Sequence, residues 1–324
     1  MIRFLAVRAT QAAVIVFLVT TLTFVLIQLA PGSPFTASGE SNRVSPEITQ
    51  RLEQSFGLDR PVPEQYIRYL SNLARGNFGY SFAEYRPARD AFLERVPNTL
   101  LLAGAGLVIM FGLGILVGAF QGARPGSRTD DILSLVTLAI YSMPIFWLGL
   151  MALLLFGLAL HWLPVGGTHD PVIYEQLGIM GKLGDRLRHL LLPAITLGLI
   201  GAATTARYQR AAMLDVIRQD FVRTARAKGL TERAVLFKHA LRNALLPIIT
   251  LFGLAFPILL SGTVLVESIF SWPGLGKLAV DAIHGRDYFV VTGAATVTAI
   301  MVVLGSLIAD VLYRVVDPRT REQA

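Results

Sequence analysis

The 324-residue sequence contains no cysteine, and charged residues make up only 16% of it. Without cysteine, no disulfide can join its segments and no thiolate metal site can form. Hydrophobic residues account for 53% of the chain, and the mean hydropathy is +0.57. Soluble globular proteins carry about 25% charged residues, so a soluble fold of this length would have too few polar residues to cover its surface. We therefore predict an integral membrane protein.

Six long stretches of the sequence carry no Asp, Glu, Lys or Arg. They run approximately over residues 9–30, 99–120, 132–160, 189–206, 244–266 and 289–308. A helix that crosses the bilayer core needs about 20 apolar residues, and the third stretch is long enough to tilt or to continue past the interface. The first is about twice as long as the apolar core of a signal peptide, so we interpret it as a retained helix. The predicted fold class is all-α, with six transmembrane helices.

Basic residues indicate the orientation of these helices. With the N-terminus in the cytoplasm, the inside segments hold 16 Lys and Arg against 8 Asp and Glu, whereas the outside segments hold 13 against 14. Cytoplasmic loops of membrane proteins carry the excess of Lys and Arg, so we predict that both termini are cytoplasmic. The chain then divides into residues 1–30 with the first helix, an extracytoplasmic loop subdomain at 31–98, and a core domain at 99–324 with a cytoplasmic loop at 207–243.

Sequence signatures of covalent chemistry and of ion coupling are absent. A nucleotide-binding P-loop needs Ser or Thr after Gly-Lys, but Leu278 and Leu183 follow the two Gly-Lys pairs. The five histidines are scattered, without the ligand spacing of zinc sites. No ionisable residue lies in the middle of a predicted span, which disfavours a membrane enzyme, a charge-selective channel and a stand-alone secondary transporter. We predict no catalytic residue, cofactor or metal site here, and any ATP would be bound by another chain.

Four prolines fall within the apolar stretches, at Pro144, Pro193, Pro247 and Pro257. Proline inside a helix removes a backbone donor and can kink it. These prolines are therefore candidates for a moving gate, although static kinks explain them equally well. Gly114 and Gly118 form a G-x-x-x-G pattern, which in membrane helices favours close packing.

The polar segment at 31–98 predicts a small helical subdomain. Residues 46–53 and 63–70 both begin with Pro-Glu and read as helices. Residues 57–61, with glycine first and proline last, predict a turn between them.

The basic loop at 207–243 predicts a helix, a glycine break and a second helix. Residues recur at helical spacing before the break, at Leu214, Ile217, Phe221 and Thr224. Gly229 follows basic residues, as a C′ glycine does, and Thr231 can cap the next helix. The pattern superficially resembles a DNA-reading helix-turn-helix, but both ends run directly into predicted spans. Three interpretations remain open: a lipid-contacting loop, a solvated connector, or, as we favour, a docking element for a cytoplasmic partner.

This loop resembles the permeases of binding-protein-dependent ABC importers. Their shared motif is Glu-Ala-Ala, three residues, Gly, nine residues and Ile-x-Leu-Pro, of which this chain keeps Ala225, Gly229 and Leu241. The dipeptide/oligopeptide/nickel branch is a closer match, on Arg-Thr-Ala-Arg-Ala-Lys-Gly-Leu at 223–230 and His-Ala-Leu-Arg-Asn-Ala-Leu-Leu-Pro at 239–247. Other blocks similar to that branch follow in order along the chain, at residues 57–61, 76–81, 95–99, 267–276, 286–288 and 317–319. The long first outside loop is similar to that of the B-type permease of the branch.

The resemblance implies the type I ABC importer permease fold and one half of a path for peptides across the cytoplasmic membrane of a prokaryote. It implies a C-type permease as the partner in a heterodimer, two ATPase subunits that bind ATP and Mg²⁺, and an extracytoplasmic substrate-binding protein. The alternative cargo within the branch is nickel or another small solute. By position, the helix that couples to the ATPase would include Arg223, Thr224, Ala225, Lys228, Gly229 and Leu230. The residues facing the binding protein would include Asp59, Arg60, Gln65 and Tyr66 in the outer loop.

Overall fold

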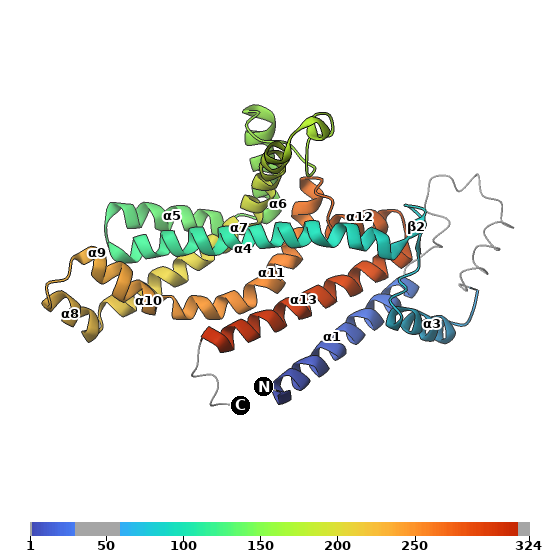
Figure 1. Cartoon of the computed structure of the whole chain (residues 1–324), viewed down its shortest axis with the longest axis horizontal. Helices are drawn as coiled ribbons and strands as arrows, with labels where there is room; N and C mark the ends of the chain where they lie inside the picture. The colour runs from blue at the N-terminus through green and yellow to red at the C-terminus, as the bar shows by residue number, and fades with distance from the viewer. Residues whose placement is uncertain (1, 30–58, 317–324) are drawn as a thin grey trace. The chain divides into compact units, whose positions relative to one another are not determined.

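The computed structural model describes residues 2–29 and 59–316, with side chains described for residues 6–29 and 59–311. The described residues are almost entirely helical (Figure 1). In chain order the elements are α1 (Ile2–Leu29), α3 (Val62–Ala74), β1 (Tyr80–Ser81), β2 (Arg86–Pro87), α4 (Ala88–Ala123), α5 (Arg128–Ser142), α6 (Ile145–Ala152), the π-helix η1 (Leu153–Ala159), the 3₁₀ helix η2 (Tyr174–Gln176), α7 (Ile179–Ile217), α8 (Asp220–Ala227), α9 (Glu232–Ala234), the π-helix η3 (Val235–Ala240), α10 (Leu241–Ala244), α11 (Leu246–Ile269), α12 (Leu275–His284) and α13 (Tyr288–Val316). The two short strands pair antiparallel, with Tyr80 opposite Pro87.

Five of the described helices are long and apolar enough to cross a membrane. They are Ala6–Leu29 of α1, Ala88–Ala123, Ile179–Ile217, Leu246–Ile269 and Tyr288–Val311 of α13. A sixth span exists if α5 and the helix that follows it are counted together, although the two are bent by 106°. The predicted third span is therefore not one straight helix. The break falls at Met143, which is extended (ψ 133°), because a residue before proline is disfavoured in the helical region.

The sequence suggested that all four prolines lie inside helices, but only two of them do. Pro193 and Pro257 do lie within α7 and α11. Pro144 instead caps the start of α6 at the 106° bend, and Pro247 lies in the first turn of α11. Proline is tolerated in a first turn because the N–H it lacks would have no partner there. The interior position is therefore wrong for Pro247, whereas Pro144 stands at a sharp bend, between α5 and α6.

The chain forms two compact units, and the first comprises residues 1–99 and 273–304. Within it, α1, α3 and α13 are joined by hydroxyl groups. Thr20 of α1 lies 3.3 Å from the hydroxyl of Thr296, and Thr21 lies 2.6 Å from the hydroxyl of Tyr66 on α3. The predicted helix at 63–70 is confirmed as α3. The predicted helix at 46–53 lies outside the described residues.

The second unit comprises residues 100–272 and 305–324, and α7 is its central helix. This helix packs against α5, α6 and α11. The main core is made of side chains from α4, α7 and α11 with the two aromatic residues that follow α11: Leu102, Leu190, Leu192, Ala194, Leu197, Leu259, Val266, Phe270 and Trp272.

A seam of glycines brings α4 against α7. A Cβ atom built on Gly118 would lie 2.4 Å from the carbonyl oxygen of Ala206, and one on Gly122 would lie 2.4 Å from Cβ of Met213. One on Gly114 would meet Thr205 at 2.5 Å. These distances are far below van der Waals contact, so only glycine lets the backbones approach this closely. The packing interpretation of Gly114 and Gly118 is confirmed.

Candidate functional site

The first candidate site is the α8–α10 segment, residues 220–244, which follows directly from the end of α7 (Figure 1). The prediction of one helix through Leu214 and Thr224 is wrong, because α7 ends at Ile217. Gln219 is extended (ψ 152°), and its carbonyl accepts hydrogen bonds from Val222 and Arg223 at the start of α8. The break lets α8 take its own direction.

A glycine turn separates α8 from α9, as the sequence predicted. Gly229 has φ +76°, a conformation that side-chain-bearing residues rarely adopt. Its N–H donates to the carbonyl of Arg226 at 2.9 Å. Thr231 then caps α9, with its hydroxyl accepting from the N–H of Ala234 at 3.4 Å. Both local predictions are confirmed.

The α8–α10 segment has its own small apolar core. Val222 and Ala225 of α8 are buried. They pack with Met213 and Val216 from the end of α7 and with residues of η3 and α10, namely Val235, Ala240 and Ala244. This core fixes α8 against the end of α7, so movement of one is transmitted to the other.

The outer face of this segment combines basic and large apolar side chains. Arg223, Thr224, Lys228 and Gly229 are exposed, whereas Ala225 faces the core and therefore supports α8 from within. Phe221 is 40% exposed and Leu230 is 42% exposed. Phe221 and Leu230 are thus large apolar side chains open to solvent in a basic segment, which makes this segment a candidate for a protein contact.

Two further residues on this face were not singled out from the sequence. In the sequence, Phe221 indicated only a helical repeat, and no prediction rested on Phe237. Phe237 is more exposed than Phe221 or Leu230. Phe237 and Lys238 line a shallow groove with Thr231, Arg233 and Ala234. A large apolar residue next to a basic one in a polar loop is the sequence signal that could have found them.

An ion pair bridges the turn on the solvent side. The guanidinium of Arg226 donates to Glu232 at 2.7 and 3.1 Å. This hydrogen bond lowers the pKa of the Glu232 carboxyl below its usual value. Both side chains are well exposed, and exposed pairs contribute only about 0.2–1 kcal/mol. The turn therefore depends mainly on Gly229 and the apolar core.

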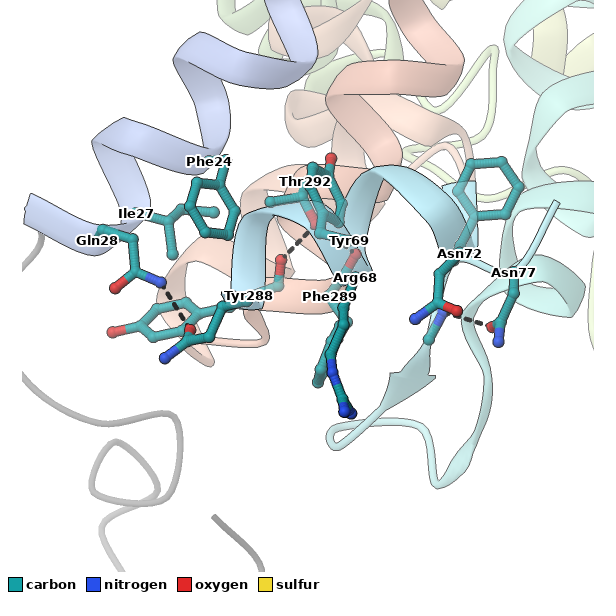
Figure 2. A pocket seen from close by; sticks show the side chains of 13 residues that line it. Phe24, Ile27, Gln28, Arg68, Tyr69, Asn72, Asn77, Tyr288, Phe289 and Thr292 are labelled. Atoms are coloured by element: carbon teal, nitrogen blue, oxygen red, sulfur yellow. Dashed lines mark hydrogen bonds between the residues drawn. The ribbon is translucent and has the colours of Figure 1, made fainter. Parts of the chain in front are cut away.

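The second candidate site is a pocket of about 130 Å³ within the first unit (Figure 2). Phe24 and Ile27 of α1 and Phe289 of α13 supply apolar walls, and Asn72 and Arg68 of α3 supply polar groups. The pocket thus offers apolar contact together with amide and guanidinium donors.

The outer residues picked from the sequence separate into two pairs. Gln65 accepts a hydrogen bond from Gln28 of α1 at 2.9 Å. The ring of Tyr66 packs on Phe24 of α1, with centroids 5.2 Å apart. These two therefore hold α3 against α1. Asp59 and Arg60 are exposed before α3.

No three His, Asp or Glu side chains within residues 6–29 and 59–311 lie close enough together to hold a metal ion.

Comparison with known proteins covers the whole chain. Residues 95–322 match the family described as binding-protein-dependent transport system inner membrane component, and residues 1–103 match the N-terminal model of the same systems. The di/tripeptide transport system permease protein DppB of Pseudomonas aeruginosa is 44% identical over all of both chains. The oligopeptide transport system permease protein AppB of Bacillus subtilis is 40% identical, over 97% of this chain and 98% of that one.

Solved structures of similar fold include an ABC transporter chain. A chain of the inward-facing MetNI methionine ABC transporter superposes with a TM-score of 0.56 and 18% identity, over 70% of this chain and 96% of that chain. With the family match, this confirms the type I ABC importer permease fold expected from the sequence.

Proposed function

This chain belongs to the inner membrane component family of binding-protein-dependent transport systems, and from this premise we propose that it is a permease subunit of an ATP-driven importer of di- and oligopeptides. Similarity over the full length to a di/tripeptide and an oligopeptide permease supports the peptide cargo. The observation that supports the mechanism is the structure of the α8–α10 segment. Its short helices are held by their own apolar core, and Arg223 of α8 is exposed together with Lys228 and Leu230 of the following turn.

In this account the chain performs no covalent chemistry. Two partner ATPases bind ATP and Mg²⁺, and one of them receives the exposed face of the α8–α10 segment in a groove. Arg223, Thr224, Lys228, Gly229 and Leu230 make the contact, and Ala225 holds α8 to its core. A C-type permease supplies the other half of the path. The chain is a multi-pass protein of the prokaryotic cytoplasmic membrane with both termini inside.

The ATPase contact is tested with Leu230→Asp. A buried, unpaired carboxylate is costly at a protein contact, so we expect co-purification of the ATPases with the permease to fall by about tenfold, equivalent to about 1.4 kcal/mol. The matched control is Glu232→Gln, which removes only an exposed ion pair and should change co-purification less than twofold. Equal recovery of ATPases with Leu230→Asp and with the unsubstituted chain would show that this face is not the contact.

The opposite side receives ligand from a binding protein, and Asp59 and Arg60 are the residues proposed to face it. Charge at the rim of a contact mainly governs the rate of association. We expect Asp59→Lys to raise the binding-protein concentration for half-maximal uptake about threefold, with an unchanged maximal rate. Asp90→Lys makes the same change in charge on another exposed residue, in the first turn of α4, and should leave this concentration unchanged. Equal effects of the two substitutions would contradict a specific role for Asp59.

A further inference from the structure

A buried carboxylate joins two helices of the second unit that lie far apart in sequence. Asp130 near the start of α5 accepts two hydrogen bonds from Arg210 of α7. The Nε to Oδ1 and the Nη2 to Oδ2 distances are both 2.7 Å. The Asp130 side chain is 1% exposed and that of Arg210 is 33% exposed. Two parallel bonds from one guanidinium fix the relative orientation of the groups as well as their distance.

The carboxylate is itself held in place by the corner between α4 and α5. The N–H of Gly126 donates to Asp130 Oδ2 at 3.0 Å, and Ser127 caps α5 by accepting from the N–H of Asp130. Gln121 of α4 donates to Ser134 of α5 at 3.0 Å. The carboxylate that accepts from Arg210 is therefore fixed to the corner between α4 and α5. If α7 moves, a change of the Asp130 rotamer would break these bonds.

The same two turns of α7 hold the α8–α10 segment. Met213 lies three residues after Arg210 and Val216 six residues after it, and both belong to the core that buries Val222 and Ala225 of α8. Residues three apart on a helix are neighbours on its surface. The end of α7 is thus fastened by neighbouring residues both to the α4–α5 corner and to α8.

Resting on the proposed function, we propose that Arg210 and Asp130 are positioning residues of the coupling step: their paired hydrogen bonds transmit displacement of the α8–α10 segment through the end of α7 to α4 and α5. The apolar core ties α8 to the end of α7, and its Met213 also packs closely on Gly122 of α4. The ion pair adds a connection to the start of α5, and it does so with directional bonds, which resist rotation and sliding better than apolar contact does.

Removal of Arg210 would leave the buried Asp130 carboxylate without its guanidinium partner, which can prevent folding. The informative substitution is Arg210→Lys, which keeps the charge but cannot form the two parallel bonds. Arg207→Lys is the matched control. Arg207 lies on the same helix, is exposed, and stacks over Tyr141, an interaction that lysine also makes.

The first measurement uses the purified chain in nanodiscs and needs neither partner nor peptide. Trypsin cleaves after the basic residues between Arg218 and Arg242, and cleavage reports local opening. We expect Arg210→Lys to speed cleavage in this stretch about threefold over Arg207→Lys. Equal cleavage of the two variants overturns the mechanical connection, whatever the chain transports.

The second measurement uses the reconstituted complex with both ATPases, the C-type permease and the binding protein. We expect Arg210→Lys to lower the number of peptides taken up per ATP hydrolysed about fivefold, with ATPase activity within about twofold of that of Arg207→Lys. A purely structural role would lower the amount of complex and leave this ratio unchanged. An unchanged ratio overturns the coupling role. If the unsubstituted complex shows no response to peptide, the proposed function is contradicted, and the cleavage measurement alone then tests whether the Arg210–Asp130 ion pair connects the α8–α10 segment to α5.

Discussion

Valine at position 229 is expected to uncouple ATP hydrolysis from peptide uptake. Gly229 has φ +76° and ends α8. A β-branched residue in this conformation is strained by about 1–3 kcal/mol. No atom lies within 4 Å of a Cβ placed there, so the substitution creates backbone strain without a steric clash. The chain relieves the strain by changing the turn, which displaces Lys228 and Leu230 on the ATPase-facing surface.

We expect Gly229→Val to insert in the membrane normally and to lower ligand-dependent uptake by about tenfold, which corresponds to about 1.4 kcal/mol and lies within the range of the strain. The measurement compares uptake with ATP hydrolysis in the same proteoliposomes. Gly229→Asn is the first control, since asparagine tolerates positive φ and should retain most uptake. Gly76→Val is the second, because Gly76 has φ +71° with open space around it but lies in the outer loop. Unchanged peptide-stimulated hydrolysis and uptake in Gly229→Val would refute the docking account of this turn.

The second large effect is expected at the glycine seam. A leucine at position 118 would place its Cβ 2.4 Å from the backbone of Ala206 and 2.7 Å from Cβ of Gln209. Backbone cannot move aside as a flexible side chain can, so α4 and α7 must separate. Overpacking of a core costs about 1–3 kcal/mol or more. Here it also separates α4 from α7, the helix that leads into the α8–α10 segment. We expect almost no folded chain to be recovered from the membrane.

Gly112→Leu is the matched control for the seam. Gly112 lies on the same helix, and a Cβ there meets nothing within 4 Å. The two variants have the same composition and hydropathy, so membrane insertion should not distinguish them. The monodisperse fraction after detergent extraction, measured by size-exclusion chromatography, should be near normal for Gly112→Leu and near zero for Gly118→Leu. Equal yields would contradict the close approach of α4 and α7.

Features that depend on local chemistry were predictable from the sequence. Apolar runs without charge located the long helices, since the bilayer requires their length and composition. Gly229 and Thr231 were interpreted correctly because a C′ glycine and an N-cap act through neighbouring backbone groups alone.

Most features that depend on packing between distant segments were not predictable; the G-x-x-x-G pattern is an exception. Pro144 marked the break between α5 and α6, but the angle of 106° between the two helices could not be derived from the proline alone. Gln65 and Tyr66 were expected to face outward, yet they contact α1 about 40 residues earlier. Arg210 and Asp130 are 80 residues apart, and each looked like an ordinary loop or helix-end charge until the fold brought them together.

The central claim, that this chain forms half of a peptide path driven by partner ATPases, is tested most directly by peptide-stimulated ATP hydrolysis. Proteoliposomes would contain this chain, a C-type permease, both ATPases and the binding protein, and would receive di- to pentapeptides or Ni²⁺ in turn. The account predicts that peptides raise hydrolysis and accumulate inside, and that Ni²⁺ does neither. Stimulation by Ni²⁺ alone, or a fully assembled complex that no peptide stimulates, would contradict it.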